Sequence, residues 1–407
     1  RTHRSLRTER IHDHFFLRRR GVNEKPSSDG FFYGSCVARS LFSFLIESSL
    51  DRMTTPVDSS RGARINPKSK YLKSELVFEH PEGLDEAFDP LHPTTYLLEY
   101  PKKIINRIDS PDIPTDFSVN PYQGCEHGCT YCYARNTHAY WGLSPGLDFE
   151  QKIIVKPEAP RLLEAEMRKR NWKPAPIMLS GNTDCYQPAE RHWKITRQLL
   201  EVALKFRNPI GIITKNKLVL RDLDLLKELA SLNLVHVYLS ITSLDEKIRR
   251  VLEPRTVTGR QRLETVRRLS EAGIPAGVMV APIIPGINAP EIPTIIEAAA
   301  AAGALNAGMT IVRLNDAVAD VFKSWLHEHF PDRAEKVLNQ IAECHGGSLS
   351  DSRFGTRMSG EGNIAESIKQ LFRQSVRRHL AGRSVPGYDL SAFRIPEERM
   401  QLRLDLF

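Results

Sequence analysis

The stretch NPYQGCEHGCTYCYAR, residues 120–135, decides how the rest of the chain is interpreted. It places three cysteines, Cys125, Cys129 and Cys132, in the spacing C-x3-C-x2-C, with the aromatic Tyr131 directly before the last one. Three thiols leave one unpaired, and these spacings are too short for relaxed bridges, so a disulfide framework is excluded. Soft thiolates gathered on one loop select zinc or an iron–sulfur cluster.

The remaining cysteines bear on the choice between these two metals. A structural zinc site normally has four ligands, usually as two pairs well separated in sequence. No second pair exists here, because Cys36, Cys185 and Cys344 are scattered and His127 is the only imidazole inside the loop. Three thiolates on a four-iron cluster leave one iron open for substrate chemistry. The spacing therefore favours a [4Fe-4S] cluster, with zinc or a plain buried loop as the alternatives.

At these residues the chain resembles the radical S-adenosylmethionine (SAM) superfamily, whose hallmark is C-x3-C-x-φ-C with an aromatic φ. The flanks NPYQGC and TYCYAR are similar to the branch that includes spore photoproduct lyase. The resemblance implies that Cys125, Cys129 and Cys132 bind a [4Fe-4S] cluster, that SAM binds its open iron, and that Tyr131 packs against the adenine. It also implies an electron donor such as a flavodoxin or ferredoxin.

The sequence after residue 115 alternates short apolar runs with segments of helical spacing, the pattern of βα units. Strands are predicted at 117–119, 177–180, 210–214, 235–241, 276–281 and 307–312, with an extra strand at 152–155. Helices are predicted at 159–170, 193–206, around 225–229, and at 263–272, 291–302, 332–344 and 364–380. Six such units can form a doubly wound sheet or a partial barrel, and the pattern alone does not choose. The resemblance implies an α/β fold with a partial (β/α)6 barrel, an N-terminal extension and a C-terminal helical region.

Four segments follow from this pattern. Residues 1–75 are expected to be a basic, polar lead-in, of which 1–52 fits no targeting class and is interpreted as upstream sequence before Met53. Residues 76–115 are predicted to form a cap of strands and loops. The core barrel is assigned to 116–320, and a mainly helical region of unassigned role to 321–407.

The predicted strand ends carry candidate cofactor residues, since sites in parallel α/β folds lie at the carboxyl ends of strands. Strand two ends in LSGNTD, where Gly181 permits close backbone approach and Asn182 and Thr183 supply short polar groups. By resemblance this end holds the methionine amino group of SAM, with Thr183 as the contacting hydroxyl. A polar turn is the structural alternative.

Later strand ends add further candidates. Lys215, after strand three, can pair with the SAM carboxylate as a point charge. Ser240, at the end of strand four, falls where the superfamily takes a hydroxyl to the cofactor. Arg255 can clamp a carboxylate or phosphate bidentately, or be an ordinary surface arginine.

The resemblance to the lyase stops at its hydrogen-donating cysteine, which lies two residues before the SAM-contacting hydroxyl. Counting back from Thr183 gives Gly181, so that donor is absent. Cys185 is the candidate catalytic replacement if it faces the barrel, and otherwise a small buried hydrophobic residue. Photoproduct repair is therefore not transferred to this chain.

Composition places the chain among globular enzymes. Of its 407 residues, 41% are hydrophobic and 26% charged, and no run is long enough to cross a membrane. The six cysteines show no pattern of disulfide pairing, which indicates a reducing compartment and hence a cytoplasmic location. The net charge of +8 gives a slight preference for nucleic acid among possible substrates. The prediction is a radical SAM enzyme of unassigned substrate; a zinc-binding nucleic-acid module and a non-catalytic barrel scaffold are the alternatives.

Overall fold

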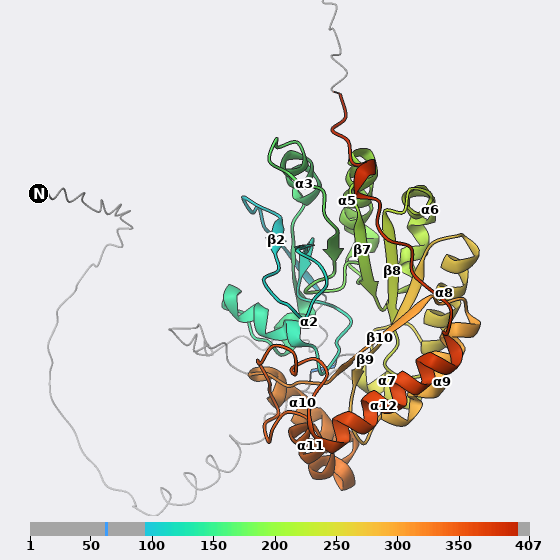
Figure 1. The fold of residues 1–407 in the computed structure, drawn as a ribbon. Helices are drawn as coiled ribbons and strands as arrows, with labels where there is room; N and C mark the ends of the chain where they lie inside the picture. Colours follow the sequence, from blue (N-terminus) through green and yellow to red (C-terminus); the bar gives the residue numbers. More distant parts are fainter. Residues whose placement is uncertain (1–61, 64–93, 398–407) are drawn as a thin grey trace, which may run out of the picture. The chain divides into compact units, whose positions relative to one another are not determined.

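The computed structural model describes residues 62–63 and 94–397 (Figure 1). The chain divides into two compact units, 1–55 and 56–407, and every described residue belongs to the second. The predicted upstream segment 1–52 lies outside the described residues. The same holds for the lead-in 1–75, apart from Gly62 and Ala63.

A seven-stranded sheet forms the centre of the described structure, in the order β10-β9-β8-β7-β6-β3-β2. Its strands are β2 (Ile105–Arg107), β3 (Phe117–Val119), β6 (Ile177–Leu179), β7 (Ile210–Thr214), β8 (Val235–Ser240), β9 (Ala276–Ile283) and β10 (Asn306–Ile311). Neighbours from β3 to β10 pair in parallel, and β2 runs antiparallel at the edge. The predicted α/β fold with a partial (β/α)6 barrel is confirmed, and the boundaries of its strands differ from prediction by at most two residues.

Helices connect the parallel strands and cover one face of the sheet (Figure 1). They are α3 (Ala159–Met167), α5 (Ile195–Phe206), α6 (Leu223–Ser231), α8 (Gly259–Glu271) and α9 (Ile292–Ala301). Helix α7 (Glu246–Leu252) also follows β8, but its apolar residues pack in a second cluster that includes Cys129 and Tyr131. Strand alternation explains the core: in β8, Val235, Val237 and Leu239 have no exposed area, whereas His236 and Tyr238 are partly exposed on the other face. The main hydrophobic core therefore lies between the sheet and these helices.

The other face of the sheet pairs large side chains with glycines on the neighbouring strand. Tyr238 of β8 is in register with Gly277 of β9, and Met279 of β9 with Gly308 of β10. A Cβ atom on Gly277 would lie 2.4 Å from the Tyr238 ring, and one on Gly308 would lie 2.6 Å from the Met279 sulfur. The large side chains can lie across these strands because the glycines carry no side chain.

A second, three-stranded sheet brackets the cysteine loop. It has the order β1-β5-β4, with β1 (Thr95–Leu98), β5 (Lys152–Val155) and β4 (Tyr122–Gln123). The extra strand predicted at 152–155 is confirmed as β5. Because β4 ends two residues before Cys125, this sheet fixes where the cysteine loop begins.

Three helices follow the barrel: α10 (Ala317–His329), α11 (Ala334–Glu343) and α12 (Gly362–His379). The last two were predicted within two residues at each end. Helix α10 was missed, although Val318, Val321, Phe322, Trp325 and Leu326 recur at helical spacing and are all buried. None of the helices in the described part of the chain is long and apolar enough to cross a membrane.

Residues 383–394, here called the C-terminal strap, cross the ends of several barrel elements. The Arg383 guanidinium donates to the carbonyls of Ala300 and Ala304 at 2.8 and 2.7 Å. The Tyr388 ring stacks on His236 with centroids 3.9 Å apart. The strap thereby ties α9 to the start of β8.

Candidate active site

Two glycines give the cysteine loop its backbone path. Gly124 and Gly128 have φ of +80° and +69°, a region that residues with a side chain rarely adopt. A Cβ atom on Gly124 would lie 3.0 Å from the carbonyl oxygens of Phe149 and Lys152. The amide of Cys125 donates to the Phe149 carbonyl at 2.8 Å, so the loop lies flush against the chain beside β5.

A buried carboxylate holds this loop from one side. Glu150 accepts a 2.6 Å hydrogen bond from Arg135, and neither side chain has any exposed area. The same carboxylate accepts from the amides of Gly62 and Ala63 at 2.9 and 2.6 Å. Arg135 also donates from Nε to the Cys129 carbonyl at 2.9 Å. The ion pair therefore links the loop backbone to a short segment far upstream in the sequence.

The three thiols share one electrostatic environment. Burial, the largest cause, raises the pKa of Cys125, Cys129 and Cys132, and that of Cys129 reaches about 12. The positive charge of Lys215 lowers the pKa of Cys129 and Cys132, and that of Arg135 lowers the pKa of Cys132. A bound metal deprotonates a coordinating thiol, and these cations would stabilise the resulting thiolates.

The cysteine loop has features that suit an iron–sulfur cluster. Two buried polar atoms of the loop, Glu126 Oε2 and Thr130 Oγ1, have no hydrogen-bond partner among the described residues. Such orphaned atoms indicate that the loop is shaped to adjoin another group. In the described ranges, no three His, Cys, Asp or Glu side chains are arranged to hold a single metal ion. The thiolate chemistry and the orphaned atoms fit a cluster spread over three spaced cysteines.

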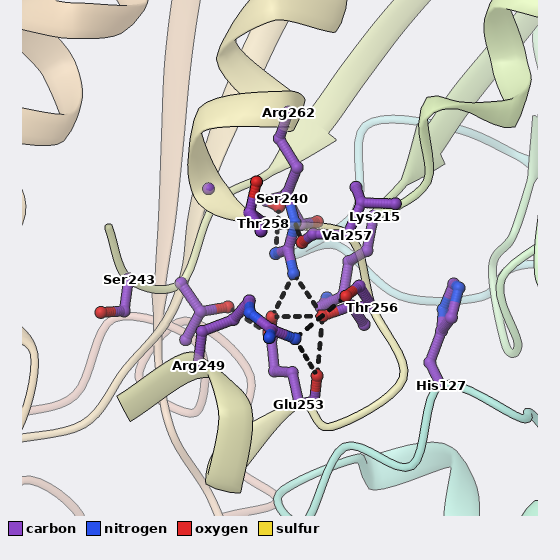
Figure 2. A network of polar contacts seen from close by, with 12 residues as sticks. His127, Lys215, Ser240, Ser243, Arg249, Glu253, Thr256, Val257, Thr258 and Arg262 are labelled. Carbon is purple, nitrogen blue, oxygen red and sulfur yellow. Dashed lines mark hydrogen bonds and ion pairs between the residues drawn. The ribbon is translucent and has the colours of Figure 1, made fainter. Parts of the chain in front are cut away.

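Behind the loop, a buried ion pair joins α8 to the end of α7 (Figure 2). Arg262 donates to Glu253 at 2.5 Å, and neither side chain has any exposed area. Burial would raise the pKa of Glu253, but the charges of Arg262 and Lys215 and the hydrogen bond from Thr242 outweigh it and hold this pKa at about 2. The hydroxyl of Tyr131 also donates to Glu253. The carboxylate is therefore a charged acceptor beside the cysteine loop.

The predicted residues after β6 are hydrogen-bonded to residues on both sides of the three cysteines. The Gly181 carbonyl accepts a 2.8 Å hydrogen bond from Tyr133, and the amide of Asn182 donates to Asn120 at 2.8 Å. Thr183 is 3% exposed, and its hydroxyl donates to a backbone carbonyl of β4 at 2.7 Å. The Thr183 oxygen can still accept a hydrogen bond, which is what an amino group requires.

Lys215, Ser240 and Arg255 lie around the same loop. The Lys215 ammonium is 5.9 Å from the centre of the Tyr131 ring. Ser240 is 5% exposed, and its carbonyl accepts from the buried arginine of α8 at 2.8 Å. Arg255 lies 3.6 Å from the Glu126 carboxylate and is 29% exposed. The guanidinium of Arg255 therefore already faces an acidic side chain of the loop.

Cys185 lies in the main hydrophobic core with no exposed area. Its amide donates to the Ser180 hydroxyl at 2.8 Å, and its carbonyl accepts from Thr196 at 2.7 Å. Burial raises the pKa of the thiol well above its ordinary value. This position favours the packing role over the catalytic one, which stays a prediction.

The segment that contains the cysteine loop and most of the barrel is similar to known proteins. The profile of the Radical SAM superfamily matches residues 119–299. An uncharacterized protein of Mycobacterium tuberculosis is 32% identical over 234 residues, which cover 57% of this chain and 69% of that protein. The chain belongs to the radical SAM superfamily. An uncharacterized protein of Methanocaldococcus jannaschii is 28% identical over 249 residues, covering 59% of this chain and 86% of its own.

The fold of this radical SAM protein is similar to that of spore photoproduct lyase. A structure of the lyase complexed with dinucleoside spore photoproduct gives a TM-score of 0.53 at 16% identity. The match covers 71% of this chain and 80% of the lyase. At this identity the likeness concerns the fold, and it agrees with the branch suggested by the cysteine flanks.

Three polar residues, one inside the loop and two beside it, were not predicted to be part of this radical SAM site. His127, named before only as a nearby imidazole, lies 3.4 Å from Asp184, and burial lowers its pKa to about 4. Glu253 and Arg262 were not singled out. One signal was available: Arg262 falls on the apolar face of α8, four and seven residues before Val266 and Leu269. A charged residue at such a position needs a buried partner.

Proposed function

We propose that this radical SAM protein reductively cleaves SAM at a [4Fe-4S] cluster bound by Cys125, Cys129 and Cys132. When bound by these cysteines, the cluster would supply the one electron that cleaves SAM into methionine and a 5′-deoxyadenosyl radical, and that radical would take a hydrogen atom from the substrate. The observation that supports this most directly is that three thiols share one glycine-shaped loop, with Cys125 and Cys129 buried, and that the charge of Lys215 acts on Cys129 and Cys132.

The chain's own residues position the cofactor and exclude water. Lys215 would pair with the SAM carboxylate, because its ammonium lies over the Tyr131 ring and has no carboxylate within ion-pair distance in the described ranges. The Tyr131 ring would contact the adenine. The remaining proposed cofactor contacts are Gly181, Asn182, Thr183, Ser240 and Arg255. With Cys125 and Cys129 each 7% exposed, the loop keeps bulk water from the ligands.

The substrate and the electron donor are proposed by class. A flavodoxin or ferredoxin would deliver the electron. Nucleic acid is the first substrate class to test, because the structurally similar lyase is complexed with a dinucleoside lesion and this chain carries a net charge of +8. The lyase reaction itself is not proposed, because Gly181 stands where that enzyme's donor cysteine is expected.

The test is anaerobic reconstitution with iron and sulfide, reduction, and assay for 5′-deoxyadenosine. The parent protein should be brown, hold about four irons per chain and release 5′-deoxyadenosine. Alanine at Cys125, Cys129 or Cys132 should abolish colour and cleavage, whereas Cys185→Ala is the matched control and should keep the iron. Stoichiometric zinc without iron would support the zinc module, and a loaded cluster without SAM cleavage would support the scaffold.

A further inference from the structure

A four-residue segment at the end of α7 runs alongside the cysteine loop. The amide of Thr130 donates to the Leu252 carbonyl at 3.2 Å, and the amide of Arg255 donates to the His127 carbonyl at 3.3 Å. Between these bonds, a Cβ atom on Gly128 would lie 3.3 Å from the Pro254 ring. Residues 252–255 therefore follow residues 127–130 in the opposite direction, and we call this segment the brace.

Glu253 of the brace forms the buried ion pair with Arg262 of α8 (Figure 2). Besides its bond to Glu253, Arg262 donates to the Thr256 hydroxyl at 2.6 Å and from Nη1 to the Ser240 carbonyl at 2.8 Å. Arg249 donates to the carbonyl of Glu253 at 3.1 Å. Every polar group of the pair is thus bonded within the described structure, and the pair is joined to the end of β8.

The same carboxylate joins the cysteine loop to β9. Glu253 accepts from the hydroxyls of Tyr131 and Thr242, the latter at 2.6 Å. Thr242 lies 3.1 Å from the carbonyl of Ala281. Through Thr242, this carboxylate therefore connects the residue before Cys132 to the ends of β8 and β9.

Stability alone does not account for such a pair. Removing two charges from water costs about as much as their attraction returns, so a buried ion pair is often replaceable by apolar residues. The pair also lies close to Cys129, because Thr130, the next residue, is hydrogen-bonded to Leu252, which directly precedes Glu253; both charges act on that thiol. Its position makes two opposite charges available at one cluster ligand.

We propose that Glu253 and Arg262 are positioning residues that hold the cysteine loop in register with β8 and β9 and set the reduction potential of the cluster. The inference rests on the proposed function, since it needs a cluster on Cys129. Removing the negative charge of Glu253 leaves Arg262 unopposed, which stabilises the reduced, more negative cluster and raises the potential. Removing the positive charge of Arg262 leaves Glu253 unopposed and lowers it.

The experiment is a redox titration of the reconstituted cluster, followed by electron paramagnetic resonance. Glu253→Gln should shift the midpoint potential upward and Arg262→Gln downward, with the double variant returning toward the parent. Glu253→Asp keeps the charge and should stay near the parent. Arg267→Gln is the matched control on α8, because Arg267 also pairs with glutamates but is 48% exposed; it should not move the potential.

The outcomes separate this inference from the proposed function. If the parent takes up no iron, the proposed function fails before any variant is compared. If the parent loads a cluster but Glu253→Gln and Glu253→Asp give the same potential as the parent, the inference is overturned. If Arg262→Gln does not fold, the comparison of Glu253→Gln with Glu253→Asp decides alone, because both alter the same hydrogen bond and only one alters the charge.

Discussion

Lys215 directly follows β7 and lies beside the cysteine loop. Its ammonium lies 5.9 Å from the Tyr131 ring, a cation–π distance, and its amide donates to Asp184 at 2.8 Å. The backbone of Lys215 is therefore fixed, while the charged end is left for an anionic group. Proposed contacts through hydroxyls, such as Thr183 and Ser240, start from side chains that are almost fully buried.

Lys215→Ala should weaken SAM binding more than Thr183→Ala or Ser240→Ala. Losing one partner of a desolvated charge pair costs about 2–5 kcal/mol, whereas losing one neutral hydrogen bond costs roughly 0.5–1.5 kcal/mol. Equilibrium binding of SAM to reconstituted protein measures both, with iron content unchanged. Lys217→Ala, an exposed lysine two residues on, is the control. Parent-like affinity in Lys215→Ala would remove this lysine from the site.

Because of His138, the free energy of unfolding should decrease at acidic pH. Burial lowers the pKa of this imidazole from 6.5 to about 4, and the side chain has no exposed area. Between these two values the unfolded chain binds a proton and the folded chain does not. The stability that neutral His138 contributes is therefore fully present above pH 6.5. It falls as the pH drops toward 4, by up to about 3 kcal/mol.

Chemical unfolding across this pH range tests the His138 effect. His138→Gln cannot titrate, so its free energy of unfolding should fall less between pH 6.5 and pH 4 than that of the parent. The comparison uses the slope against pH, because the substitution also changes packing at every pH. If the free energy of unfolding changes with pH in the same way for parent and variant, His138 is protonated equally in the folded and unfolded chains.

Among the elements, β8 and β9 depend on the absence of a side chain at Gly277. A Cβ atom there would lie 2.4 Å from the Tyr238 ring, which is rigid and cannot move aside like a chain end. Gly277→Ala should lower the free energy of unfolding by about 1–3 kcal/mol through overpacking. Gly387→Ala is the control, because a Cβ there meets nothing within 4 Å. Equal unfolding midpoints for the two variants would contradict the prediction.

The elements also show what the sequence could and could not predict. Apolar runs such as 210–214 and 235–241 predicted the parallel strands, because a strand covered on one face by helices and partly buried on the other is apolar almost throughout. The edge strand β2 has three residues, of which two are exposed, so it carries no such pattern. Helix α10 has apolar residues at helical spacing and could therefore have been predicted from the sequence.

The candidate site divides in the same way. The cysteines and strand ends were predictable because their spacing and order along the chain are local. The partnership of Glu253 with Tyr131, 122 residues apart, depends on tertiary packing that no local pattern encodes. The burial of Cys185 likewise depends on which face of the turn after β6 meets α5.

For the whole molecule, the upstream residues 62–63 matter more than their distance in sequence suggests. Gly62 and Ala63 together give Glu150 two hydrogen bonds, and such bonds to a charged group contribute roughly 1.5–3 kcal/mol each. A chain beginning at Met53 keeps them and should fold, load iron and cleave SAM like the full chain. A chain beginning at residue 64 should lose stability and bind less iron.

Thermal unfolding and iron content of the two truncated proteins provide the measurement. Loss of iron in the chain beginning at Met53 would show that residues 1–52 contribute to the structure, against their interpretation as upstream sequence. Full iron content in the chain beginning at residue 64 would show that the contacts to Glu150 are dispensable.

The contacts of the C-terminal strap can form only late in synthesis on the ribosome. Tyr388 donates to the carbonyl of Ile210, a contact across 178 residues. At the usual rate of roughly 5–20 residues per second, synthesis of that interval takes about 10–35 s. The cysteine loop leaves the ribosome even earlier than β7, so its thiols exist for that whole period in a chain whose barrel is not yet tied together. Because the strap does not exist during this period, it cannot contribute to the burial of these thiols until synthesis is nearly complete.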